Sequence, residues 1–133
     1  MPIKMPDYLA DLNVSAAPRP PLKILHEAAE RLKDQTGGLV EGLVSVLNPG
    51  KAEFYRYTFY LLAPRLNDYT DPLFYAWHND HLYPVNVMLA GDQVDPNDKG
   101  EATDRLLERK LQEIFEGETA RRRIQALIAT ARS

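Results

Sequence analysis

The sequence predicts a single soluble α+β domain: a four-stranded antiparallel meander of two consecutive hairpins, with one N-terminal helix and a C-terminal helical hairpin packed on the sheet. Apolar residues recur at helical spacing before residue 36 and again after residue 100. Between residues 36 and 100, apolar and polar residues alternate as they do in strands, and two turn signals interrupt this pattern. The chain of 133 residues has the length of one domain. We expect residues 1–21 to be an extended, proline-rich segment and residues 22–133 to form the domain.

The first helix is predicted from Pro21 to Gln35. Proline suits the first turn of a helix because its missing N–H would have no partner there. The Gly37-Gly38 pair that follows stops the helix, since glycine accepts the left-handed conformation in which many helices end. The apolar stripe of this helix consists of Leu22, Leu25, Ala29 and Leu32.

The first hairpin is predicted from Leu39–Leu47 and Ala52–Leu62, joined by a turn at Asn48-Pro49-Gly50-Lys51. Proline and glycine are residues that tight turns favour at their centre. With Pro49-Gly50 as the tip, Val44 faces Tyr55. One face of this hairpin is then apolar and aromatic and the other is mixed, which predicts an antiparallel sheet with one buried face.

The second hairpin is predicted from Leu73–His78 and His81–Leu89, turning at Asn79-Asp80, with residues 63–72 as a loop before it. Asn-Asp is a less favourable tip than Asn-Gly, so a longer loop is the alternative. Pro84 has no backbone donor, which indicates an edge position or a bulge in the last strand.

The C-terminal third is predicted to be helical after a polar loop over residues 91–100. Helices are expected at Glu101–Phe115 and Thr119–Ala131, separated by Gly117, and should form a helical hairpin that covers the sheet. The polar loop contains aspartates at alternating positions, but it lacks the glycine and the terminal glutamate of an EF-hand. These aspartates are Asp92, Asp95 and Asp98.

Composition and charge exclude several classes of function. The chain has no cysteine, which excludes disulfides and cysteine nucleophiles and favours a reducing cytoplasm. The net charge of −3 argues against a nucleic-acid binder. Arg121, Arg122 and Arg123 form a basic run, but nearby glutamates offset it. No apolar run approaches the ~20 residues of a membrane span, so no membrane association is expected.

The sharpest chemical feature is the pair of histidines at the second turn. With Asn79-Asp80 as the tip, His78 faces His81, and the two rings could share a metal with Asp80 as a third ligand. This arrangement would suit a metal-dependent hydrolase. The alternative is an exposed polar turn without a ligand, since two histidines with no fixed third ligand are a weak motif.

An aromatic surface is the better-supported candidate site. The same pairing places Tyr75, Trp77 and Leu82 on the face of the sheet opposite the apolar one, and Tyr57 is expected to contribute to partner binding. Tyrosine and tryptophan are enriched at binding hot spots. The alternative is that a helix or the N-terminal segment covers this face.

No catalytic or cofactor motif is present, so we expect no cofactor and predict a non-catalytic protein-binding module. A small bacterial-style adaptor, or a protein that neutralises a basic toxin or enzyme in the manner of an immunity protein or antitoxin, would fit the acidic charge. The alternatives are a self-associating subunit, such as a homodimer, that uses the aromatic face or an open strand edge, and the metal-dependent hydrolase described above.

Overall fold

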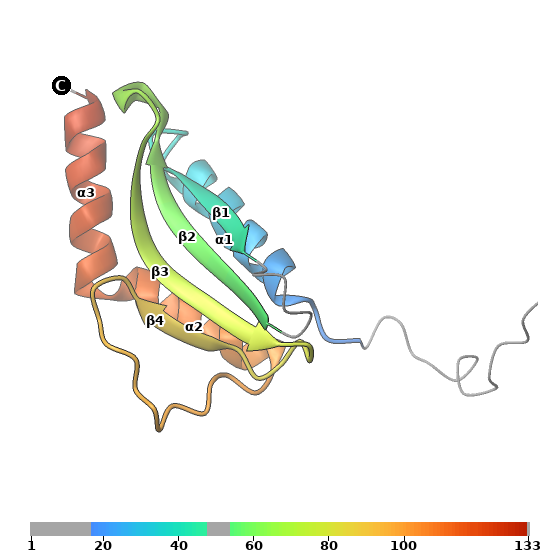
Figure 1. The fold of residues 1–133 in the computed structure, drawn as a ribbon. Helices are drawn as coiled ribbons and strands as arrows, with labels where there is room; N and C mark the ends of the chain where they lie inside the picture. The colour runs from blue at the N-terminus through green and yellow to red at the C-terminus, as the bar shows by residue number, and fades with distance from the viewer. Residues whose placement is uncertain (1–16, 48–53, 133) are drawn as a thin grey trace, which may run out of the picture.

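The computed structural model describes residues 17–47 and 54–132 (Figure 1). The elements follow one another as α1 (Pro21–Gln35), β1 (Glu41–Leu47), β2 (Phe54–Ala63), the 3-10 helix η3 (Pro64–Leu66), β3 (Tyr69–Asn79), β4 (Asn86–Leu89), α2 (Asp104–Glu116) and α3 (Glu118–Arg132). The four strands form one antiparallel sheet in the order β1-β2-β3-β4. The predicted fold class is therefore confirmed. Most of the proline-rich segment, residues 1–16, lies outside the described residues, so its extended form stays a prediction.

Helix α1 has the predicted bounds, Pro21 to Gln35. Ile24, Leu25 and Leu32 are its buried apolar side chains, together with the ring of Pro21. The chain leaves the helix through two glycines with positive φ, 63° and 83°, as the Gly37-Gly38 signal predicted. Helix α1 then packs back onto β1, the next element of the chain.

The register of the first hairpin differs from the prediction by four residues, because Val44 pairs with Phe59 instead of Tyr55. The last described pair of the ladder is Leu47 with Arg56, and this register is not the one that a Pro49-Gly50 tip would give. That turn itself lies outside the described residues. A shift of an even number of residues keeps the alternation of side chains, and the predicted inner face of β1 and β2 is therefore the one observed.

Gly42 lets α1 approach the sheet closely. A Cβ atom on Gly42 would lie 2.6 Å from the Cβ of Ala29 on α1 and 2.5 Å from the Cζ of Phe59 on β2. Deeper in the core, the rings of Phe59 and Phe74 stack with centroids 4.9 Å apart, and Phe115 of α2 meets Phe59 edge-on at 5.6 Å. The core therefore lies between one face of the sheet and the helices.

Strand β3 begins at Tyr69, whereas residues 63–72 were predicted as a loop. The turn is confined to η3 and to Asn67 and Asp68, which both have φ near 57°. Pro72 lies inside β3, next to the irregularity where the pairing shifts between Phe59 and Tyr60. A bulge of this kind accommodates proline in a strand, because it leaves a position that donates no ladder hydrogen bond.

The predicted two-residue turn at Asn79-Asp80 is wrong, and the alternative of a longer loop is what the structure contains. Trp77 pairs with Asn86 instead of Leu82, and β4 is short. Before β4 the chain pairs elsewhere: the N–H of Val85 donates to Glu101 O at 2.9 Å, and the N–H of Glu101 donates to Val85 O at 2.6 Å. This bridge ties the last loop to the edge of the sheet.

The bridge explains why α2 begins at Asp104 and not at Glu101. Thr103 caps the helix, because its Oγ1 accepts a hydrogen bond from the N–H of Leu106 at 3.1 Å. Gly117 ends α2 in an extended conformation, as predicted, and α3 follows at once. Within residues 17–47 and 54–132, none of the helices combines the length and the apolar character that crossing a membrane requires.

Candidate functional site

One face of the sheet carries no helix among the described residues. Figure 1 shows α1 and α2 behind the sheet and α3 beside β3, so the opposite face is open to the viewer. Because side chains alternate along each strand, this face is made of the residues between the buried ones. We call it the outer face; its central members are Leu43, Ser45, Leu47, Arg56, Thr58, Tyr60, Tyr75, Trp77, Asn86 and Met88.

The centre of the outer face is aromatic. Arg56 pairs with Trp77, and its guanidinium carbon lies 4.8 Å from the ring centroid of Tyr75. A cation over a ring at this distance is worth about 0.5–1 kcal/mol at an exposed site, which favours one position of the tyrosine ring. On β1, Leu43 and Leu47 are 44% and 54% exposed. Tyr75 and Trp77 therefore share one partly exposed face, as the alternation predicted.

The structure does not bring Leu82 and Tyr57 to this face. Leu82 lies in the loop between β3 and β4, 40% exposed, because Asn86 takes the position opposite Trp77. Tyr57 pairs with Ala76 on the inner face and is only 6% exposed, so a partner on the outer face has no access to it.

His78 is a buried residue and not part of an exposed turn. It is 3% exposed, and its Nε2 lies 2.8 Å from the hydroxyl of Tyr57. Its Nδ1 lies 2.6 Å from Asn79 O and 3.0 Å from His81 O. Because two carbonyl oxygens face Nδ1, this nitrogen carries the proton and Nε2 accepts from the tyrosine. Both ring nitrogens are thus engaged within the fold.

The predicted facing of His78 and His81 does not occur. The His81 side chain is 86% exposed, and its Nε2 lies 3.9 Å from the Oδ1 of Asp80. Residues 17–47 and 54–132 contain no group of three or more His, Cys, Asp or Glu side chains placed to hold a metal. The corrected register and the strand alternation, which turns His78 inward, explain the difference. The signal was present in the sequence, since His78 continues the two-residue spacing of Phe74 and Ala76.

A hollow of about 200 Å³ lies at the β4 edge of the sheet. Its apolar lining consists of Trp77, Val87, Met88, Leu89, Val94 and Ile114. The polar loop after β4 adds three acidic residues to the lining, Asp92, Asp95 and Asp98. Lys110 of α2 contributes the one cationic side chain of the described lining. The hollow therefore has apolar walls and carries a net negative charge.

The loop after β4, residues 91–100, is called the acidic loop, and hydrogen bonds within it stabilise its conformation. One carboxylate oxygen of Asp95 accepts from the N–H of Asn97 at 2.9 Å, and one of Asp98 accepts from the N–H of Gly100 at 2.9 Å. All three aspartates are exposed. The sequence predicts no calcium site at these aspartates, and it does not indicate that they lie beside Trp77. Only the position of the folded loop shows that relation.

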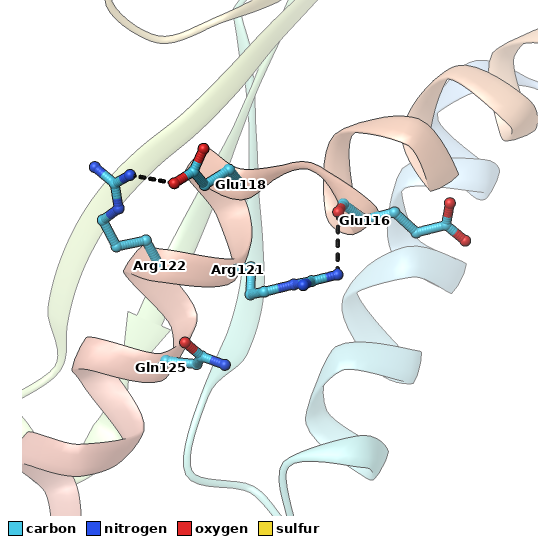
Figure 2. Close-up of a pocket in the computed structure, with 5 residues that line it drawn as sticks. All are labelled: Glu116, Glu118, Arg121, Arg122 and Gln125. Atoms are coloured by element: carbon cyan, nitrogen blue, oxygen red, sulfur yellow. Dashed lines mark hydrogen bonds and ion pairs between the residues drawn. The ribbon is translucent and has the colours of Figure 1, made fainter.

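A second hollow, of about 500 Å³, lies where α2 meets α3 (Figure 2). Arg122 forms an ion pair with Glu118 at 2.6 Å, and Arg121 donates to the main-chain oxygen of Glu116 at 3.5 Å. Arg123 points elsewhere and donates to Pro72 O at 3.0 Å. The basic run predicted from the sequence is thus divided among separate partners.

The segment before α1 is anchored at Arg19. Its guanidinium forms ion pairs with Glu27 at 3.2 Å, with Asp104 at 3.7 Å and with Glu108. The hydroxyl of Tyr83 donates to Arg19 O at 2.7 Å, and burial, reinforced by the charge of Asp104, raises the pKa of Tyr83 to about 12. The hydrogen bond from the N–H of Arg19 lowers the pKa of Asp104 below its usual value. This cluster fastens α1, α2 and the loop before β4 together, and it is structural.

No protein-family model, curated protein or solved structure matches this chain. The aromatic outer face lies next to the hollow of about 200 Å³ at its β4 edge, which we call the acidic hollow. Both are accessible at the surface of the protein. Trp77 belongs to both.

Proposed function

We propose that the protein is a non-catalytic binding module whose outer face docks a segment of a basic partner protein. The observation that carries this proposal is the position of Trp77, which joins the aromatic outer face to the acidic hollow. Tryptophan and tyrosine combine a large apolar surface with a polar tip, and both are enriched where proteins meet. An adaptor, or a protein that neutralises a basic toxin or enzyme, would use such a surface in a reducing cytoplasm.

The size of the outer face favours a reversible complex. Four strands span about 15 Å at ~4.8 Å per spacing, and seven residues span about 24 Å at ~3.4 Å each. The product is on the order of 350 Å², compared with roughly 800 Å² per partner in a stable complex of standard size. We therefore expect an extended segment or a small surface as the docked element.

Charge favours a basic partner. The chain carries a net charge of −3, and three aspartates stand at the β4 edge of the outer face. Arg56, the cation of the outer face, already lies over the ring of Tyr75. Complementary charge raises the rate of association and selects among partners. Because these charges are exposed, added salt should weaken the complex. At physiological ionic strength, exposed charges more than about 8 Å apart are already largely screened from each other.

Selection of displayed peptides tests this proposal. A random peptide library would be panned on the full chain, and the enriched peptides would be measured by titration against the wild type and two variants. Tyr75→Ser removes an aromatic ring from the centre of the outer face. Tyr69→Ser is the matched control, because Tyr69 is a 53% exposed tyrosine of the same strand near its other end.

We expect the enriched peptides to bind about tenfold more weakly to Tyr75→Ser, equivalent to the loss of one contact worth 1.4 kcal/mol, and equally well to Tyr69→Ser. Thermal unfolding of each variant checks that the fold is kept. Peptides that bind both variants as tightly as the wild type would contradict the proposal, as would a selection that enriches nothing.

A further inference from the structure

The acidic hollow is too small for an ordinary cofactor. Pockets for small molecules have volumes of about 300–1,000 Å³, whereas this hollow has about 200 Å³. That space suits one amino-acid side chain. The composition of its lining then selects the kind of side chain, because apolar and acidic residues both contribute to it.

The lining of the hollow combines apolar and acidic residues. Trp77, Met88 and Leu89 supply apolar lining from the sheet, while the carboxylates come from the loop after β4. Lysine and arginine have the matching division, with methylene stems that bury against apolar surface and a charged head that stays in polar surroundings. The indole of Trp77 is also the ring that attracts a cation most strongly.

We propose that this hollow is a specificity pocket for one lysine or arginine side chain of the partner segment that docks on the outer face. The inference deepens the function proposed above and rests on it. The methylene stem lies along the apolar wall, and the cationic head reaches the carboxylates of Asp92, Asp95 and Asp98. Lys110 stands in the same lining and opposes the incoming cation.

The charges of the lining predict opposite effects for two substitutions. Three aspartates and one lysine give the lining a formal net charge of −2. Asp92→Asn makes the site less negative and should weaken the binding of a cation. Lys110→Met keeps most of the apolar stem, removes the competing charge and should strengthen it. A role of these residues in folding alone would not produce this pair of opposite signs.

Trp77 gives a direct readout, because it is the single tryptophan of the chain. The probes are N-acetyl-lysine methylamide and its uncharged analogue N-acetyl-norleucine methylamide, titrated into the full protein while the indole N–H resonance of Trp77 is followed by NMR. We expect the lysine probe to bind with a dissociation constant on the order of millimolar, and the norleucine probe about tenfold more weakly. Added salt should weaken only the lysine probe.

Equal binding of the two probes would overturn the inference, and so would weaker lysine binding by Lys110→Met than by the wild type. These failures differ from failure of the proposed function. If selected peptides need Tyr75 but contain no lysine or arginine, the outer face binds a partner and the hollow is not its specificity pocket.

Discussion

The hydroxyl of Tyr57 on β2 and the Nε2 of His78 on β3 lie 2.8 Å apart in the interior of the protein. The other ring nitrogen of His78 lies within 3.0 Å of two carbonyl oxygens, that of Asn79 at the end of β3 and that of His81 in the following loop. His78 therefore connects the middle of the sheet to the loop that leads to β4. Burial raises the pKa of Tyr57, so the phenol stays protonated and continues to donate.

We predict that Tyr57→Phe lowers the free energy of unfolding by about 1–3 kcal/mol, because it leaves a buried acceptor on His78 without its donor. Urea denaturation of the purified variant measures this change. Tyr55→Phe is the matched control, since Tyr55 also stacks on His78, with centroids 5.2 Å apart, and its hydroxyl forms no hydrogen bond with residues 17–47 or 54–132. The control should change stability by less than about 0.5 kcal/mol. Equal losses in both variants would contradict the prediction.

Gly42→Ala should destabilise the protein through overpacking. The added Cβ would lie 2.7 Å from the Cα of Ala29, a main-chain atom of α1 that has no rotamer to change, and closer still to the ring of Phe59. Inserting a methyl group into a packed core usually costs about 1–3 kcal/mol. The thermal midpoint should fall accordingly. Ser45→Ala, on the exposed side of the same strand, is the control and should leave the thermal midpoint nearly unchanged. A thermal midpoint for Gly42→Ala equal to that of the wild type would refute the close approach of α1.

Stability should fall at alkaline pH, and Tyr83 should contribute to the fall. Its pKa is about 12 in the folded protein, compared with 10.0 for an ordinary tyrosine. A raised pKa means that the folded state holds the proton more tightly, so the contribution is complete below pH 10 and is lost as the pH rises towards 12. The midpoint of urea unfolding, measured from neutral pH to about pH 11, should be flat and then decline.

Tyr83→Phe removes this titration and should give a shallower alkaline decline, although its stability at neutral pH is lower because the hydrogen bond to Arg19 O is lost. The alkaline slope thus reports the titration of Tyr83, and the stability at neutral pH reports its hydrogen bond to Arg19 O. Identical alkaline slopes for the wild type and the variant would show that Tyr83 does not carry the effect.

The elements and faces of this fold follow from local patterns, but the registers do not. The bounds of α1 are set by Pro21 and Gly37, and the inner and outer faces are set by alternation, so Tyr75 and Trp77 could be assigned to one surface. The strongest turn signals predict two-residue tips, whereas the described pairs, Val44 with Phe59 and Trp77 with Asn86, follow other registers. Leu82 was assigned to the outer face because of this error.

The hollow could not be predicted because it depends on contacts distant in sequence. The loop after β4 reaches its place beside Trp77 only when Glu101 pairs with Val85 and α2 packs behind β4. The alternation of residues in β3 predicts that His78 is buried. Its contact with Tyr57 cannot be predicted in this way, since the partner of a buried polar group depends on the register of both strands.

The bridge between Val85 and Glu101 has a consequence for how this protein can diversify. The N–H of Ala90 donates to Leu73 O at 2.9 Å, so the acidic loop is fixed to the sheet at its first residue as well as at its last. Changing the length of a loop whose ends are fixed costs only a few tenths of a kcal/mol for small insertions. The loop can therefore lengthen, shorten or exchange its charges while the sheet and the core stay the same. In evolution or in engineering, new recognition could arise in this loop on an unaltered scaffold.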